Sequence, residues 1–515
     1  MRIGTNVAAI VANNALQKSQ NNLSTSIERL SSGYKINGSK DDAAGCAISE
    51  KMRAQIRGLS QAQNNTADGV SVLNTAEGAI TEIQSMLTRL KELSVQAAND
   101  VNSDDEREAI QKEIEQINNE IDRISDQTEF NTQSLINGNL SRRVYSDLQG
   151  VNQISVSDSY TAGVYGITVT EDARQAIAVG AGSITMSSTA YITEEQAGAI
   201  NINGYKISIS EGDTLDKVMG KIIDGVNITG GSAFTVKDLN NDTAANGTDY
   251  AGYVPTADYA GSTLVIMTNQ YGSDQKMNIT CDNAELADIL GIPQAATQDG
   301  IYVEGSDVKA EIATGDDGKR IGFADSAILS TKGTVITVTD VNNKEFSMDV
   351  PGNAAGTVFD DSNNDGQSVA GAGTARTISQ EVTDVGTMSI HVGANQDQVI
   401  VIDIPAITTY SLGTEHMNVM TQYTASRAIS TVDEAINKTN KIRSRIGAYE
   451  NRFDHTTNNL EVSSENLTKS LSTMIDTDMS EEMTTYTSET VLTQAATSIL
   501  AQANERPSQV LQLLQ

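Results

Sequence analysis

The sequence predicts an α+β multidomain protein: a long α-helical coiled-coil rod is formed by both termini, and a β-rich outer insertion lies between them. Apolar residues recur at helical spacing in residues 1–140 and 411–515, whereas residues 141–410 show strand-like alternation. Four of the five prolines and 30 of the 40 glycines lie in this middle region, and both residue types interrupt helices. The middle region also holds 35 Asp and Glu against 14 Lys and Arg.

Two apolar stripes predict long helices in the N-terminal arm. One steps by four and three residues, the a/d spacing of a coiled coil, through Ile110, Ile114, Ile117, Ile121 and Ile124. The other begins at Ile48 and runs to Leu90, after two candidate N-caps at Asp41 and Asp42. A helix over about 43–99 is roughly 85 Å long. The C-terminal arm carries a similar stripe from Val432 to Leu471.

The middle region predicts strands around one short helix. The segments "GVYGITVT", "NINGYKISIS", "STLVIMTN" and "TVITVTDV" alternate or are rich in β-branched residues, and Gly, Asn and Asp bound them. Between two of them, "DTLDKVMGKIIDGV" has the pattern of an amphipathic helix. We therefore expect a β-rich insertion of two small units.

The C-terminal tail is unusually apolar. Eight residues, at about 1.5–3 kcal/mol each when fully buried, contribute roughly 12–24 kcal/mol, which exceeds an association cost of about 4–15 kcal/mol. They are Val491, Leu492, Ile499, Leu500, Val510, Leu511, Leu513 and Leu514. A membrane-surface helix or an intramolecular helix is the alternative. The polar face consists of Gln, Asn and Ser rather than Lys and Arg, which favours self-assembly.

Composition argues against several classes of function. A net charge of −32 disfavours nucleic acid and membrane partners. We expect no signal peptide and no transmembrane helix, and no disulfide between Cys46 and Cys281. No catalytic motif, cofactor motif or metal motif is present in the sequence, and its three histidines are isolated. "DDSNNDGQS" begins like a calcium loop, but Ala372 stands where a bidentate Glu is needed.

Several segments closely resemble bacterial flagellin, the subunit of a motility filament. They are "SSGYKINGSKDDAAGCAISEKMRAQIRGLSQAQNN", "ELSVQAAND", "DQTEFNTQSLING", "IGAYENRF" and "TSILAQANERPSQVLQLLQ". The resemblance covers both arms, whereas the middle matches only loosely. A hook–filament junction protein with the same arms is a close alternative, and a flagellin with an enzymatic or adhesive insertion is a third.

The resemblance implies a domain order and a mode of assembly. It gives an N-terminal inner-core helix (1–42), N-terminal rod helices (43–140), the outer insertion (141–384), a rod β-hairpin (385–412), a C-terminal rod helix (413–470) and a C-terminal inner-core helix (471–515). The residues implied in inner-core assembly are Ile3, Val7, Ile10, Leu16, Leu23, Ile27, Leu30, Leu492, Ile499, Val510, Leu511 and Leu514.

The resemblance also implies partners and a location. The partners are further copies of the chain in a helical homopolymer, an export chaperone, the filament cap and the hook–filament junction proteins. The route is flagellar type III export to an extracellular filament. "LTRLKELSVQAAND" is similar to the surface of other flagellins that binds Toll-like receptor 5 and also packs between protofilaments. The matching residues are Leu87, Arg89, Leu93 and Glu113.

Two local features carry structural expectations. Gly58 and Gly69 are three helical turns apart on one face, which predicts the close approach of another helix. For these two glycines and for Gly78, the alternative is a surface glycine that the helix tolerates. Cys46 is expected to be a small buried apolar residue.

Overall fold

The computed structural model describes residues 6–157, 160–180, 182–236, 259, 261–292, 300–315, 318–340, 344–352, 359–360, 369–370, 375–383 and 385–513. The chain divides into two compact units. Unit 1 consists of Met1–Val70, Ile390–Ile400 and Asn451–Gln515, and unit 2 of Ser71–Ser389 and Val401–Glu450.

The two arms form long helices, which confirms the helical part of the predicted fold. They are α1 (Val7–Ser32), α2 (Ala43–Ala97), α3 (Asp104–Gln127), α7 (Gln422–Ile475) and α8 (Met479–Leu513). Asp42 caps α2, because its Oδ1 accepts a hydrogen bond from the Ala44 backbone N–H at 3.0 Å. Ser103 begins α3 with a capping box to Glu106.

In unit 1, the first part of α2 packs on the last part of α7 and on a β-hairpin. Leu59, Ala62 and Leu460 form the buried contact between the helices. The hairpin consists of β20 (Met388–His391) and β21 (Val399–Ile402), and the His391 carbonyl accepts a hydrogen bond from Asn65.

The glycine prediction is correct at one position in unit 1 and wrong at another. A Cβ at Gly69 would lie 3.0 Å from the Phe453 ring of α7, so a helix does approach closely there. At Gly58 the close neighbour is Ala394 of the hairpin loop, not a helix, and a Cβ at Gly78 would meet nothing within 4 Å. Cys46 is only half-buried, which corrects the expectation of a buried residue. It lies in the first turn of α2, where Gly45 takes the buried position instead.

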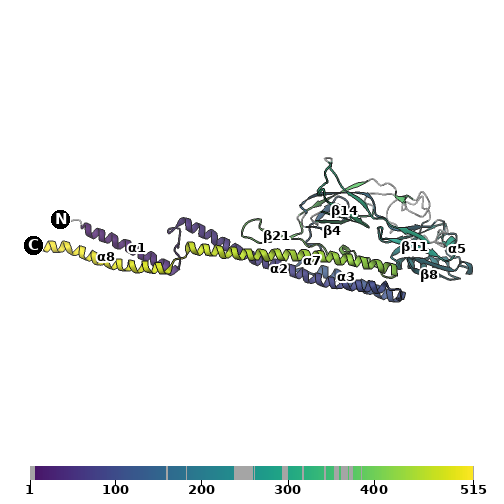
Figure 1. The fold of residues 1–515 in the computed structure, drawn as a ribbon, viewed down its shortest axis with the longest axis horizontal. Helices are drawn as coiled ribbons and strands as arrows, with labels where there is room; N and C mark the ends of the chain where they lie inside the picture. The colour runs from purple at the N-terminus through teal and green to yellow at the C-terminus, as the bar shows by residue number, and fades with distance from the viewer. Residues whose placement is uncertain are drawn as a thin grey trace. The chain divides into compact units, whose positions relative to one another are not determined.

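In unit 2, the second part of α2 packs beside α3 and the first part of α7 (Figure 1). Polar bonds join α2 to α7, including Glu77 with Arg443 at 2.6 Å and Lys91 with Asp433 at 2.6 Å. Between these helices the buried side chains include Leu73, Ile80, Ile83, Leu87, Leu90, Ile114 and Ile121, all fully buried. The predicted stripes are therefore core stripes within one chain from Leu73 to Leu90 and at Ile110, Ile114 and Ile121, whereas Ile48, where the first stripe begins, is 46% exposed.

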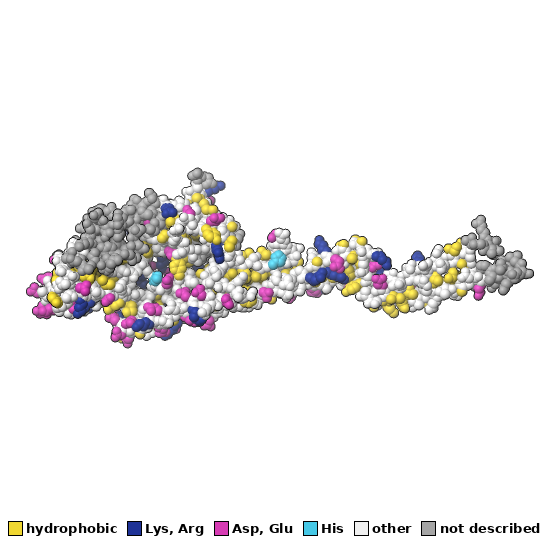
Figure 2. All heavy atoms as spheres, turned by 180° about the vertical axis from the view of Figure 1, so that it is seen from behind, with side chains coloured by type: hydrophobic (Ala, Val, Ile, Leu, Met, Phe, Trp, Pro, Cys, Tyr) yellow, Lys and Arg dark blue, Asp and Glu magenta, His cyan; other side chains and the backbone are white. Residues whose placement is uncertain are grey.

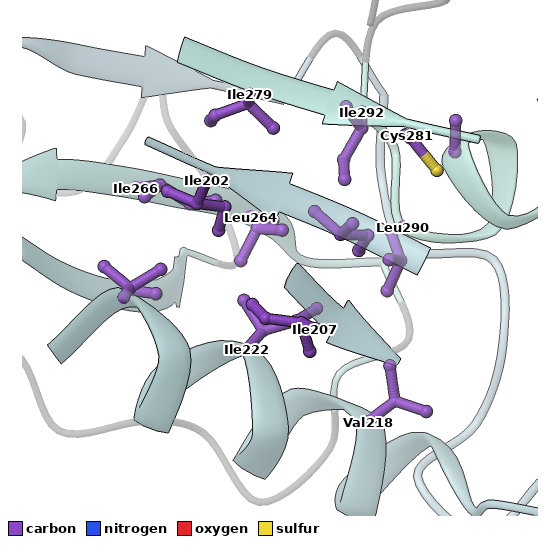
Figure 3. Close-up of a cluster of buried hydrophobic side chains, with 14 of the residues drawn as sticks. Ile202, Ile207, Val218, Ile222, Leu264, Ile266, Ile279, Cys281, Leu290 and Ile292 are labelled. Carbon is purple, nitrogen blue, oxygen red and sulfur yellow. The ribbon is translucent and has the colours of Figure 1, made fainter. Parts of the chain in front are cut away.

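The insertion contains two hydrophobic cores, each enclosed by antiparallel sheets. The first core lies between the sheets β12-β11-β7-β8 and β6-β10-β9, against the helix α4. Figure 3 shows Val218 and Ile222 of α4 pointing toward Ile202, Ile207 and Leu264 of the strands. The elements are β6 (Ile177–Val179), η1 (Glu194–Gln196), β7 (Gly198–Ile202), β8 (Tyr205–Ile209), α4 (Leu215–Ile228), β9 (Gly231–Val236), β10 (Thr263–Thr268), β11 (Lys276–Cys281), α5 (Ala284–Ile289) and β12 (Ile301–Glu304).

The second core lies between the sheets β13-β5-β19-β3 and β14-β15-β16-β4. Its strands are β3 (Val144–Ser146), β4 (Asn152–Val156), β5 (Gly163–Glu171), β13 (Lys309–Ile312), β14 (Ile328–Lys332), β15 (Val335–Thr339), β16 (Glu345–Asp349) and β19 (Arg376–Val382). The remaining elements are the pairs β1 (Glu129–Phe130) with β2 (Gln133–Ser134) and β17 (Phe359–Asp360) with β18 (Val369–Ala370), and the short helix α6 (Thr409–Leu412).

Local sequence explains the predicted elements of the insertion. The four strand segments and the short helix are all present, as β5, β7 with β8, β10, β15 and α4. Asn203 and Gly204 take positive φ of 49° and 91° between β7 and β8, the conformation that an Asn-Gly hairpin turn requires. Thr214 caps α4 through the Lys217 N–H.

A tyrosine ties the second core to α6. The Tyr410 hydroxyl donates to Asp349 Oδ2 at 2.5 Å at the end of β16 and accepts from Asn152 Nδ2 at 3.2 Å in β4. Burial and the Asp349 carboxylate raise the pKa of Tyr410 to about 12. The neutral phenol is therefore the form that holds this contact together.

Because the Phe453 ring approaches Gly69 closely, substitution by alanine should have opposite effects on stability at two glycines of α2, Gly69 and Gly78. Gly69→Ala should lower the free energy of unfolding by about 1 kcal/mol, because crowding against the buried Phe453 ring outweighs the gain in helix propensity. Gly78→Ala is the matched control and should raise it by about 0.5–1 kcal/mol. Chemical denaturation of both monomeric variants measures this. Equal stabilisation of both would mean that Phe453 does not restrict Gly69.

The Tyr410 contact predicts a stability difference that disappears at alkaline pH. Because the folded pKa of about 12 lies above the ordinary value of 10.0, the contact stabilises the fold fully below pH 10 and is lost as pH rises through 12. Tyr410→Phe should cost about 0.5–1 kcal/mol near pH 8, since the side chain is partly exposed. Denaturation curves at pH 8 and pH 12 measure the difference. Tyr145→Phe, at an exposed tyrosine, should have no effect at either pH.

Candidate functional site

The first candidate site is the pair of helices at the two ends of the chain. α1 and α8 lie side by side and antiparallel, with the two termini at the same end (Figure 1). Asn6 donates to the Ala503 carbonyl at 2.9 Å, Asn22 donates to Glu489 at 2.9 Å, and Arg29 lies 3.6 Å from Glu482. At the far end of the pair, backbone N–H groups of Lys35 and Thr477 donate to Ile475 and Gly33.

The seam between α1 and α8 is made mainly of small or polar residues at heptad spacing. The less exposed side chains of α1 include Ala9, Ala12, Leu16, Ser19, Leu23, Ser26 and Leu30, and those of α8 include Glu482, Tyr486, Glu489, Thr493, Ala496, Leu500 and Ala503. Spacing of three and four keeps them on one face of each helix. Because so many are small, the seam buries little apolar area for its length.

Larger apolar side chains point away from the seam. Val7 is 64% exposed, Ile499 57% and Leu492 50%, and Figure 2 shows hydrophobic side chains on the surface of this helix pair. The others are Ile10, Val11, Ile27, Met479, Met483 and Val491. A shallow apolar groove between the two helices is lined by Val7, Val11, Ala496 and Ile499, among others. A row of apolar side chains this long on a thin helix pair is typical of a surface that binds protein.

The predicted inner-core residues fall into three groups. Val7, Ile10, Ile27, Leu492 and Ile499 are exposed, whereas Leu16, Leu23 and Leu30 are half-buried in the seam. Ile3 and Leu514 lie outside the described residues, and Val510 and Leu511 are described only as part of the helix α8.

The second candidate site is an exposed charged cluster on α2 and α3. Arg89 Nε and Nη2 donate to Glu113 Oε1 at 3.0 Å and 2.8 Å, and Nη1 donates to Glu92 at 3.1 Å. These hydrogen bonds raise the pKa of Arg89, and the bonding to Glu113 has the largest effect. The guanidinium is thus fixed on the surface by two carboxylates.

The two leucines predicted beside Arg89 do not contribute to this surface. Leu87 is 0% exposed and Leu93 is 1% exposed, so the chain itself covers both side chains. Two of the four residues that the resemblance places on this surface are therefore buried in this chain. Helical periodicity identified the stripe that contains Leu87, but it did not show that the chain's own helices cover that stripe.

The part of the chain that the structure describes gives little support for a metal site or a membrane-spanning segment. Within it, no three His, Cys, Asp or Glu side chains are grouped as metal ligands would be. Nor does any helix there have the length and apolar character needed to cross a membrane. The calcium-like segment at 361–366 lies outside the described residues.

Both arms of the chain match known protein families, and the whole chain aligns with known proteins. Residues 3–141 match the bacterial flagellin N-terminal helical region, and residues 429–514 match the bacterial flagellin C-terminal helical region. The chain is 31% identical to flagellin of Salmonella typhimurium, over 99% of both chains. It is 30% identical to polar flagellin A of Vibrio parahaemolyticus, over 100% of this chain and 99% of that one.

Similarity to solved structures is weaker. The crystal structure of flagellar hook associated protein-3 from Legionella pneumophila aligns with 82% of this chain and 98% of that protein, at 13% identity and a TM-score of 0.28. A similarity this low supports no conclusion about this chain.

Proposed function

The chain belongs to the bacterial flagellin family, and from that premise we propose that the outward apolar face of α1 and α8 is the surface through which it polymerises. It is a structural subunit of the bacterial flagellar filament. The observation that carries the proposal is the exposure of large apolar side chains on a helix pair whose own seam is filled mainly by small or polar ones.

The energy available from this face is sufficient for association. Seven residues of the face (Val7, Ile10, Val11, Ile27, Val491, Leu492 and Ile499) are 50–64% exposed. Full burial of a side chain contributes about 1.5–3 kcal/mol, so burying the remaining half of each contributes roughly 5–10 kcal/mol. This is comparable with an association cost of about 4–15 kcal/mol. A filament subunit has several neighbours, so contacts elsewhere on the chain add to this value.

The chain also has proposed partners and a proposed location. It leaves the cell by flagellar type III export, with a chaperone, and meets the filament cap and the hook–filament junction proteins at the growing extracellular filament. A junction protein is the less favoured identity for the chain itself, because the relatives matched over the full length are flagellins. No catalytic role is proposed.

The charged cluster around Arg89 is the proposed site for Toll-like receptor 5 in the monomer. An arginine held by two carboxylates presents a rigid, flat donor group to a partner. Leu87 and Leu93 act beneath it by fixing the position of α2 against the core, not by touching the receptor. Glu113 holds the guanidinium in place and borders the same surface.

The polymerisation proposal predicts that a polar change on the outward face blocks assembly without unfolding the subunit. In the double variant Leu492→Gln, Ile499→Gln, monomer helicity and melting temperature should stay unchanged, because both side chains are already half-exposed. Seeded growth, followed by light scattering and negative-stain imaging, should yield no stable filaments. The control Gln494→Asn, Thr497→Ser changes exposed polar positions of the same helix. Normal filaments from the double variant would exclude this face.

The receptor proposal predicts a loss of affinity on removing one guanidinium. Arg89→Ala should weaken binding of the monomer to the receptor ectodomain by roughly five- to 150-fold, the range for a hot-spot residue. Arg123→Ala is the matched control, because Arg123 is an exposed arginine paired with Glu120 on α3 alone. Surface plasmon resonance measures both. Equal affinities for wild type and Arg89→Ala would remove Arg89 from the site, and a melting temperature unchanged by the mutation would show that folding is intact.

A further inference from the structure

A large polar cleft lies within unit 2 and shares no lining residue with either surface described above. It has a volume of about 750 Å³, which is in the range of sites for small molecules. One wall is formed by α3, the segment 413–418 and the first turns of α7. The opposite wall is formed by the turn between α4 and β9 and by the loop after β10.

Side-chain amides dominate this cleft. Nine of its 25 lining residues are Asn or Gln. Some of them maintain the walls: Gln111 bonds to the backbone of Met417 and Val419, and Asn418 bonds to the Ile228 carbonyl. Asn119 and Asn227, in contrast, are exposed at opposite walls. An amide offers both a donor and an acceptor without a charge.

A buried amide oxygen at the cleft has no partner. Asn118 is only 8% exposed, and its Nδ2 donates to the Thr414 carbonyl at 2.8 Å. Its Oδ1 has no hydrogen-bond partner, and neither has the hydroxyl of the fully buried Thr414. A buried polar atom without a partner is costly. Asn118 lines the cleft, but its Oδ1 is shielded from solvent, so a hydroxyl donor in the cleft would satisfy this acceptor only after a small movement of the side chain.

The cleft lining carries charges of both signs. Three carboxylates, those of Glu115, Asp122 and Glu415, face the cationic side chains of Arg427 and Lys276, and Asp122 accepts two hydrogen bonds from Thr409. Arg427 donates to Gln275 at 3.1 Å, and Lys276 is paired with Glu304 at 2.7 Å. A strongly anionic or cationic molecule would therefore meet like charges without a concentrated field of the opposite sign.

A second pocket, of about 340 Å³, adjoins the cleft and adds aromatic surface. The two share Asn203, Lys276 and Tyr423, so they form one groove. The second pocket is also lined by Tyr205 and Tyr302. Tyrosine combines a flat apolar ring with a polar tip, and here three of them follow the amide-rich part of the groove.

We propose that this groove binds a neutral oligosaccharide. Sugar hydroxyls both donate and accept hydrogen bonds, as side-chain amides do. Sugar rings have apolar faces, which can pack on the rings of tyrosines. A chain of two or more sugars would extend from the amide-rich end of the groove to its aromatic end. The activity goes beyond filament assembly, because no residue of the groove belongs to the α1–α8 face or to the Arg89 cluster.

The test measures binding of defined trisaccharides to the full-length monomer. The panel contains neutral trimers of glucose, mannose, galactose and N-acetylglucosamine, with trigalacturonate and the glucosamine trimer as charged comparisons. Saturation-transfer NMR and titration calorimetry should detect at least one neutral trimer, and it should bind more tightly than its disaccharide. Asn227→Ala and Tyr302→Ala, at the two ends of the groove, should each weaken it roughly tenfold, the effect of losing one good contact.

Controls distinguish the groove from general surface binding. Both altered side chains are exposed, so circular dichroism should show an unchanged fold. Asn459→Ala removes an exposed amide of α7 outside the groove and should leave affinity unchanged. The proposal is overturned if no neutral trimer binds, if only a charged trimer binds, or if the two groove variants bind as wild type does.

Discussion

The pairing of helices from opposite ends of the chain is the constraint on which the rest of the structure depends. α1 pairs with α8 and α2 pairs with α7, so every residue between them belongs to a loop closed by helix contacts. The entropy of closing a loop grows only with the logarithm of its length, about 0.6 kcal/mol for each doubling. A β-rich insertion with two cores of its own is therefore compatible with the same helical framework.

The paired helices differ in how much of their apolar surface the chain itself covers. Around α2, α3 and α7, three helices meet and leave large side chains such as Leu87 and Ile114 fully buried. α1 and α8 form only a pair, and two helices cannot enclose their apolar stripes. Small residues at the seam, such as Ala12 and Ser26, let the helices lie close while Val7 and Ile499 remain outside. Apolar stripes of the same kind thus give a buried core in one region and an exposed apolar surface in the other.

Polar contacts join the insertion to the helices in unit 2. Tyr410 bonds to Asp349, Lys332 to Glu434, Lys441 to Glu345 and Arg427 to Gln275. Contacts of this kind fix orientation without filling the space between the surfaces. The amide-lined groove lies along this junction, where its walls come from segments far apart in the sequence, such as Asn118 and Asn227.

The sequence by itself determined the long helices, the strands of the insertion and the family, because periodicity and turn residues are local and the arms are strongly patterned. Only the tertiary structure decided which apolar faces the chain covers. A heptad stripe shows that one face is apolar but not what packs against it, so Leu87 and Ile499 have similar patterns and opposite environments. The neighbour at Gly58, the exposure of Cys46 and the unpartnered oxygen of Asn118 likewise depend on residues more than 250 positions away or on the local path of the backbone. Spacing along one helix carries no information about those contacts.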